Sequence, residues 1–339
     1  MLMFLKFYHF LLTFILIIST SMVFSSSSWL ISWFALEINL MSFIPIILIR
    51  SSPAISEASI KYFLTQALAS SILIFASIST LKFSPFSSIN SFNNLILIAL
   101  GVKSGMAPTH FWFPQVMELI NWTQGLILLT WQKIAPLILM FSLSNSLIMN
   151  LLVISSAIMG ALGGFNINSI KKIITFSSIA HLAWMAMSTC LNFKVWIIYF
   201  LIYSFISASL VIPFHLLSVT NLSTLNIVSS NKLFKIFIFF NLLSLGGLPP
   251  LLGIFPKIIV IFSFVNLSNF NLMIMPILIL SSVITLFFYT KIIYSSMTLS
   301  SIPSQITKIY TLSHPFLFNY IMTFSILGNL SILPLVLLI

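Results

Sequence analysis

The chain has 339 residues, of which 60% are hydrophobic and only 5% are charged. Soluble domains carry roughly 25% charged residues, so this composition excludes a soluble globular fold and favours an integral membrane protein. The formal net charge is +11, but the 14 Lys and Arg residues are scattered singly between apolar runs, which argues against a nucleic-acid-binding surface.

A membrane-spanning helix needs about 20 mostly apolar residues, and about eleven such stretches occur along the chain. They lie at roughly 4–24, 28–48, 58–80, 92–118, 124–144, 147–166, 173–191, 193–217, 234–266, 272–298 and 315–338. Short connections rich in Ser and Asn separate them, and the longest are 218–233 and 299–314. The sequence therefore predicts an all-α integral membrane protein with a single transmembrane domain, 1–339.

Two of these stretches contain residues that interrupt helices. The first reads LILIALGVKSGMAPTHFWFPQV and the second FNLLSLGGLPPLLGIFPKIIVIF. Proline removes a backbone donor and clashes with the preceding turn, so both stretches are predicted to be discontinuous helices. Irregular backbone at membrane depth must line a cavity or be buried in protein, and such paired segments are typical of transport sites. Two ordinary proline kinks are the alternative.

The basic residues outside the spans are unevenly divided between the two sides of the membrane. One side holds only Lys82 and Lys194. The side of the N-terminus holds Lys6, Arg50, Lys61, Lys171, Lys172, Lys232, Lys235, Lys291 and Lys308. The positive-inside rule then places the N-terminus inside and the C-terminus outside.

The remaining basic residues, Lys103, Lys133 and Lys257, fall within predicted spans, as does Glu37. Lys133 is about 15 Å from either end of its span at 1.5 Å per residue, which is too far for its side chain to reach the interface. A lysine at mid-span costs roughly 2.5–3.5 kcal/mol on insertion scales. Some interaction or function must therefore compensate for each of these residues.

Proton transfer is the chemistry that suits buried lysines and a buried carboxylate. Burial disfavours the charged ammonium, whereas a nearby carboxylate favours it, so moving the pair apart changes lysine protonation. Glu37, Lys103, Lys133 and Lys257 are therefore predicted to form a proton relay. The alternative is a set of ion pairs that only fixes helix packing.

Two histidines extend this prediction. His181 is near the middle of its span, where an imidazole can shuttle protons, and His110 lies in the first interruption. Tyr199 and Tyr203 follow at four-residue spacing on the next span, a stripe more typical of bonding between helices. Trp112 is interpreted as an interface anchor.

Several chemistries find no support in the sequence. The lone cysteine, Cys190, forms no cluster with histidines at metal-ligand spacing, so no metal site is predicted. There is no Gly-rich nucleotide loop, nucleophile arrangement or haem ligand pair. We expect the chain itself to bind neither NADH nor an iron–sulfur centre.

Six motifs carry a resemblance to a known family. In chain order they are LEINLMSFIPI, KYFLTQALAS, GVKSGMAPTHFWFP, LLTWQKIAP, KKIITFSSIAHLAWM and LLSLGGLPPLLGIFPK. They resemble the chain 2 family of mitochondrial NADH:ubiquinone oxidoreductase (respiratory complex I), whose members are antiporter-like subunits. The match runs from about residue 28 to 290 and is specific, because order and spacing agree.

The resemblance implies an antiporter-like fold and a core membrane subunit of a proton-translocating NADH:ubiquinone reductase. It implies that Glu37 pairs with Lys103, that Lys133 is the central relay and that Lys257 leads to the exit, with His181 as a further member. NADH, FMN, iron–sulfur clusters and ubiquinone would bind other subunits. The partners would be other membrane-arm subunits and phospholipids, not nucleic acid. The location would be the mitochondrial inner membrane, with the N-terminus on the matrix side.

The sequence departs from the family at two positions. Thr109 stands where we expect Phe, which affects the packing predicted around His110, and Lys171 stands where we expect Arg. Two other functions stay open. A stand-alone cation/proton antiporter would share the buried lysines and broken helices, and a structural membrane scaffold would need them only for assembly.

Overall fold

The computed structural model describes residues 2–49, 52–82, 89–143, 146–228, 232–265, 273–298 and 315–330. Within these ranges the regular structure is helical, apart from one isolated antiparallel bridge between Ser169 and Asn221. Arg50, Lys308 and the last part of the final predicted span, 331–338, lie outside them. The chain packs as two compact units, and its assignment to a single transmembrane domain stays a prediction.

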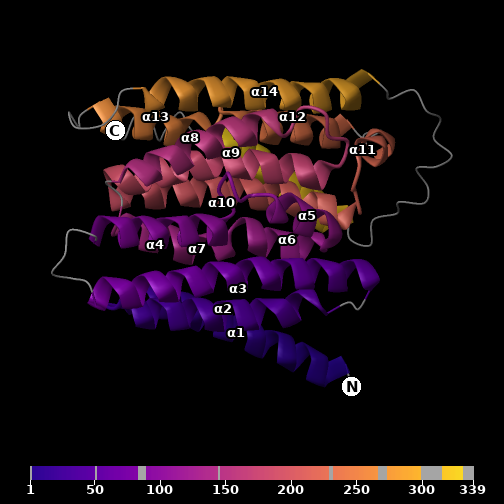
Figure 1. Cartoon of the computed structure of the whole chain (residues 1–339). Coiled ribbons are helices and arrows are strands. Elements are labelled where there is room, and N and C mark those ends of the chain that lie inside the picture. The colour runs from indigo at the N-terminus through magenta and orange to yellow at the C-terminus, as the bar shows by residue number, and fades with distance from the viewer. Residues whose placement is uncertain are drawn as a thin grey trace. The chain divides into compact units, whose positions relative to one another are not determined.

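The first unit comprises Met1–Ile120 and Trp131–Leu152. Its helices are α1 (Leu2–Ser25), α2 (Trp29–Ile47), α3 (Pro53–Lys82), α4 (Ile89–Ser104), α5 (Trp112–Leu119) and α7 (Trp131–Phe141). Figure 1 shows α1, α2 and α3 lying side by side, and α2 contacts both of the others. Since α4 contacts α3 and α7, the core of this unit lies among α2, α3, α4 and α7.

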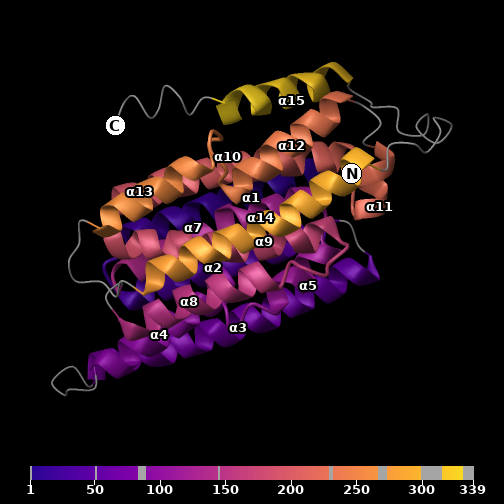
Figure 2. The same ribbon diagram turned by 90° about the horizontal axis from the view of Figure 1, so that it is seen from above.

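The second unit comprises Asn121–Thr130 and Val153–Ile339. Its helices are α6 (Trp122–Leu129), α9 (Ile170–Leu191), α10 (Phe193–Leu216), α11 (Leu222–Val228), α12 (Lys232–Gly246), α13 (Ile254–Val265), α14 (Ile274–Thr298) and α15 (Pro315–Leu330). Helix α8 (Leu147–Leu162) is divided between the units after Leu152. Helix α9 contacts α10, α13 and α14 and is the most buried of the long helices in the described ranges. Helix α15 lies along α12 (Figure 2).

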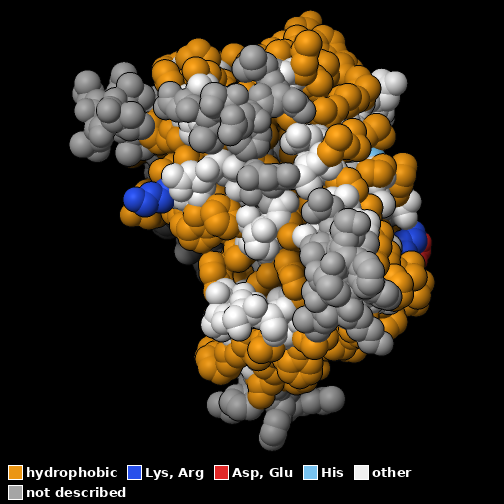
Figure 3. Space-filling model, turned by 60° about the vertical axis from the view of Figure 1, so that its left-hand side comes forward, with side chains coloured by type: hydrophobic (Ala, Val, Ile, Leu, Met, Phe, Trp, Pro, Cys, Tyr) orange, Lys and Arg blue, Asp and Glu red, His pale blue; other side chains and the backbone are white. Residues whose placement is uncertain are grey.

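The lengths of the helices agree with the prediction of a multi-pass membrane protein. Seven helical stretches in the described ranges are long and apolar enough to cross a membrane, and shorter apolar helices accompany them. Figure 3 shows a face on which most of the described side chains are hydrophobic, with lysines at its edges. Such a surface suits lipid or other apolar partners, because water would be a poor solvent for it.

Both predicted interruptions are confirmed, and the structure adds two features that the sequence did not predict. The stretch 92–118 divides into α4 and α5, and 234–266 divides into α12 and α13. The stretch 124–144, which we expected to be one helix, is divided at Thr130, whose φ of −114° and ψ of −73° separate α6 from α7. Helix α11 lies in the predicted loop 218–233.

Serine and threonine hydroxyls in the helices are satisfied mostly by backbone carbonyls of the preceding turn. Ser156 donates to the Val153 carbonyl (3.0 Å) and Ser281 to the Leu278 carbonyl (2.7 Å), and many others follow the same pattern. A hydroxyl that bonds within its own helix needs no partner in the lipid or on another helix. The Ser-rich helices are therefore compatible with a membrane environment.

Candidate functional site

The first interruption ends α4 at Ser104, the residue after Lys103. Gly105 follows in the left-handed region (φ +82°), and its N–H and that of Met106 donate to the Gly101 carbonyl (3.1 and 2.9 Å). Glycine suits this position because it adopts positive φ without the steric cost of a Cβ. Lys103 is consequently a cation in the last turn of a helix, where the partial negative charge of the helix terminus favours it.

The segment between α4 and α5 buries His110. Its side chain is only 2% exposed, and its ring stacks on that of Phe111 with centroids 4.6 Å apart. Thr109 is exposed, and its hydroxyl donates to the Met106 carbonyl (3.3 Å). The departure from the family at Thr109 therefore faces away from the buried core. Trp112, interpreted as an interface anchor, is instead buried and donates its indole N–H to the Val102 carbonyl (3.2 Å).

Glu37 on α2 and Lys103 on α4 lie in the same unit. Glu37 is half-buried, and the two side chains form no ion pair within 4.0 Å. The ion pair that the described residues do contain joins Glu57 and Lys61 on α3 (2.6 Å), where both side chains are partly exposed. The close pairing of Glu37 with Lys103 that the family implies is therefore not formed in this structure, and their coupling stays a prediction.

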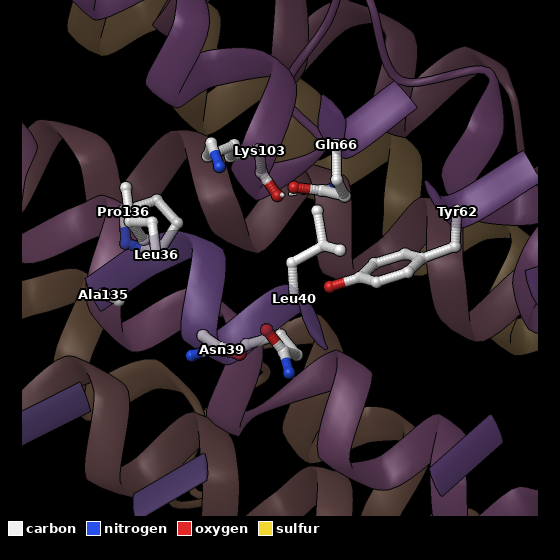
Figure 4. Close-up of a pocket in the computed structure, with 9 residues that line it drawn as sticks. Leu36, Asn39, Leu40, Tyr62, Gln66, Lys103, Ala135 and Pro136 are labelled. Carbon is white, nitrogen blue, oxygen red and sulfur yellow. Dashed lines mark hydrogen bonds between the residues drawn. The ribbon is translucent and has the colours of Figure 1, made fainter. Parts of the chain in front are cut away.

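A small, partly open pocket with room for about one water molecule adjoins Lys103. It is lined by residues of α2, α3, α4 and α7, which Figure 4 shows: Leu36, Asn39, Leu40, Tyr62, Gln66, Lys103, Gln132, Ala135 and Pro136. Gln66 donates from Nε2 to the Lys103 carbonyl (3.3 Å), whereas Asn39 Oδ1 and Gln132 Nε2 are buried without a partner in the described residues. Buried polar atoms need hydrogen bonds, so this lining suits ordered water.

Lys133 lies three residues after the break at Thr130, in the first turn of α7. Its side chain is 1% exposed, and its Nζ lies over the ring of Phe113 on α5, 5.2 Å from the centroid. The neighbouring Gln132 lines the pocket beside Lys103. The first unit therefore gathers three predicted relay residues, Glu37, Lys103 and Lys133, on helices that surround one polar pocket.

The second interruption separates α12 from α13 and holds Lys257. Gly246 ends α12, and Gly247 follows in the left-handed region (φ +83°). Lys257 is 6% exposed, and its Nζ donates to the Gly246 carbonyl (2.7 Å). The same Nζ lies over the ring of Trp184 on α9, 5.9 Å from the centroid. A carbonyl at a helix end is a favourable acceptor for a buried ammonium.

His181 is placed on α9 one turn before Trp184. It is 8% exposed, and its Nδ1 hydrogen-bonds to the Tyr199 hydroxyl (2.9 Å). Tyr203 brings its ring to 5.2 Å from the imidazole and bonds to Ser178. The predicted tyrosine stripe of α10 therefore faces the histidine. Within the second unit, His181 and Lys257 lie on helices that contact each other.

A polar network supports the second interruption and was not predicted. Asn241 on α12 is fully buried. Its Oδ1 accepts hydrogen bonds from Ser209 (2.6 Å) and Asn329 (2.9 Å). Its Nδ2 donates to the Phe237 carbonyl (3.0 Å). The Asn329 carbonyl accepts from the Leu252 N–H within the interruption (3.0 Å). Helix α15 thus satisfies backbone that the break leaves without a helical partner. Single polar residues in apolar runs are the sequence signal for such a network.

Comparison with known proteins decides the family. Residues 26–285 match the family model described as NADH:quinone oxidoreductase/Mrp antiporter, TM. The chain belongs to this family. NADH-ubiquinone oxidoreductase chain 2 of Anopheles gambiae is 48% identical over 83% of this chain and 83% of the relative, and that of Aedes aegypti is 42% identical over 83% and 84%.

Solved structures agree with the family on the fold. A chain in the structure of respiratory complex I from Thermus thermophilus matches with a TM-score of 0.83 and 21% identity, over 97% of this chain and 78% of that one. A chain of the Mrp complex from Dietzia sp. matches with a TM-score of 0.76 and 15% identity, over 96% and 75%. The prediction of an antiporter-like membrane fold is therefore confirmed.

Proposed function

We propose that the chain is a membrane-arm subunit of respiratory NADH:ubiquinone oxidoreductase in which Glu37, Lys103, Lys133, His181 and Lys257 carry protons, with His110 as a further candidate. The family and the relatives named chain 2 support the assembly. The observation that carries the proton relay is the placement of three lysines, each 1–6% exposed and each at a helix interruption. Buried intramembrane charges are costly and are functional by default.

The interruptions give Lys103 and Lys257 different surroundings for proton exchange. At Lys103, a polar pocket suited to water adjoins the side chain, so a proton can leave the ammonium for a water molecule and return. At Lys257, the Gly246 carbonyl accepts a hydrogen bond from the ammonium, but it cannot take the proton away. Displacement of Glu37 relative to Lys103 changes the balance between charged and neutral lysine, which couples charge movement to proton uptake and release.

The redox chemistry belongs to other subunits in this proposal. The described residues contain no group of three His, Cys, Asp or Glu side chains that could hold a metal ion. NADH, FMN, iron–sulfur clusters and ubiquinone would all be bound elsewhere in the complex. Phospholipids would cover apolar surface that other subunits leave open, in a mitochondrial inner membrane with the N-terminus on the matrix side.

The test is Lys133→Ala in the assembled complex, reconstituted into sealed vesicles. NADH oxidation and proton uptake are measured together, and Lys61→Ala, at a partly exposed ion pair, is the matched control. We expect fewer protons per NADH in Lys133→Ala, with assembly retained, and a wild-type ratio in Lys61→Ala. Full pumping by Lys133→Ala would overturn the relay.

A stand-alone cation/proton antiporter is the second candidate, because the Mrp chain shares the fold. Mild-detergent extraction, native separation and mass spectrometry distinguish the two. Co-migration with NADH dehydrogenase subunits, and activity that follows the band, supports the respiratory assignment. A chain that migrates alone or with other antiporter subunits contradicts it. A structural scaffold, the third reading, would lose assembly in the lysine variants without a change in protons pumped per electron.

A further inference from the structure

Two of the buried lysines share an arrangement that the proton relay alone does not explain. Lys133 places its Nζ over the ring of Phe113 (5.2 Å), and Lys257 places its Nζ over the ring of Trp184 (5.9 Å). The two pairs belong to different units, and each joins residues of two different helices. Both rings are buried, at 1% and 2% exposure, so water does not compete for the ring faces.

We propose that Phe113 and Trp184 are positioning residues for the proton relay, each presenting its aromatic face to the ammonium of a buried lysine. This inference rests on the proposed function. An aromatic face attracts a cation through its quadrupole, and the attraction is larger in a desolvated site than at the surface. Lys171 also lies over a ring, that of Trp122 at 5.6 Å, but it is partly exposed and shares its solvation with water.

An aromatic face offers something that a carboxylate cannot. A carboxylate in contact with an ammonium in a medium of low dielectric holds the charge strongly, which would oppose loss of the proton. A ring face is a weaker attractor and has no site for the proton. It therefore favours a protonated lysine, by about two- to thirtyfold in the ratio of charged to neutral forms, without trapping it.

The local backbone shows how the ring of Phe113 reaches its place. Gly105 lies against it, and a Cβ added at this glycine would come to 3.2 Å from Cδ1 of the ring, closer than ordinary contact. The Phe113 N–H donates to the His110 carbonyl (2.9 Å), which fixes the start of α5. The first interruption therefore positions the aromatic face for Lys133 as well as ending the helix of Lys103.

The experiment uses the intact complex in sealed vesicles and compares three variants at two positions. Phe113→Leu removes the ring and keeps an apolar side chain, Phe113→Tyr keeps the ring, and Phe43→Leu makes the same loss at a fully buried Phe of the same unit that packs against Tyr62. We expect the proton-to-NADH ratio of Phe113→Leu to fall toward that of Lys133→Ala. We expect Phe113→Tyr and Phe43→Leu to keep the wild-type ratio.

The outcomes separate this inference from the proposed function. If Lys133→Ala pumps fully, the relay itself fails. If Lys133→Ala loses pumping but Phe113→Leu keeps it, only the aromatic role is overturned. The aromatic role is also overturned if the proton-to-NADH ratio falls equally in Phe113→Leu and Phe113→Tyr. If Phe113→Leu does not assemble, the proton-to-NADH ratios of Trp184→Leu and Trp184→Phe are compared instead. Equal ratios in that pair overturn the proposal, and a loss confined to Trp184→Leu supports it.

Discussion

Gly247 is the position at which a single added methyl group should disturb the relay. Alanine in the left-handed region costs about 1–2 kcal/mol relative to its preferred backbone. The added Cβ would also lie 2.8 Å from Lys257 Nζ and 3.1 Å from its Cδ, too close for either atom to stay in place. When the ammonium shifts away, we expect it to lose its 2.7 Å bond to the Gly246 carbonyl, and a hydrogen bond to a charged group contributes about 1.5–3 kcal/mol.

The two costs together are about 2.5–5 kcal/mol in the local structure of Gly247→Ala. If only the lost hydrogen bond is counted, the population of Lys257 held at the carbonyl falls about ten- to 150-fold. Because the ammonium is a flexible chain end, it can move aside. We therefore expect the complex to assemble and to pump fewer protons per NADH.

The assay is proton uptake per NADH in vesicles, combined with electron cryomicroscopy of the variant. Gly101→Ala is the control, because its φ is ordinary and the atoms nearest to the added Cβ belong to the flexible Leu152 side chain, at 3.3 Å. Wild-type pumping by Gly247→Ala, with the contact between Lys257 Nζ and the Gly246 carbonyl preserved, would refute the reasoning.

Two further changes test the packing and the surface. Gly160→Ala would place a Cβ 2.5 Å from the backbone nitrogen of Ala180, and backbone cannot move aside as a chain end can. We expect native electrophoresis to show reduced assembly, and a normal amount of complex would contradict the packing. Glu57→Gln removes a partly exposed i,i+4 ion pair worth about 0.3–0.5 kcal/mol. The thermal midpoint and the proton pumping of Glu57→Gln should equal those of the wild type. A large loss of either would show that the Glu57–Lys61 pair contributes more than a surface ion pair does.

Much of the fold follows from the sequence because lipid imposes a simple rule. Apolar runs of spanning length become helices, and Gly and Pro mark where two of them break, as α4/α5 and α12/α13 confirm. The break at Thr130 could not be predicted in this way, because Thr130 has neither glycine nor proline beside it. Helix α11 was missed because it is only a short helix within a connection.

The candidate site could likewise be predicted only in part from the sequence. A charged residue in an apolar run is visible in sequence, so Lys103, Lys133 and Lys257 were predicted within spans and are buried. Their surroundings were not predictable, because Phe113 and Trp184 look like any other apolar residues until helices are packed. The roles of the relay residues stay predictions until the variants are measured.

The hydroxyls that bond within their own helices also bear on which substitutions the chain can accept over time. At a position such as Ser156, alanine would remove the donor while the acceptor keeps its helical bond, so exchange between the two residues should be nearly neutral. Ser209 is different, since its hydroxyl bonds to Asn241 on another helix. Serines of the first kind should therefore drift freely among relatives, whereas those of the second kind should change only together with their partners.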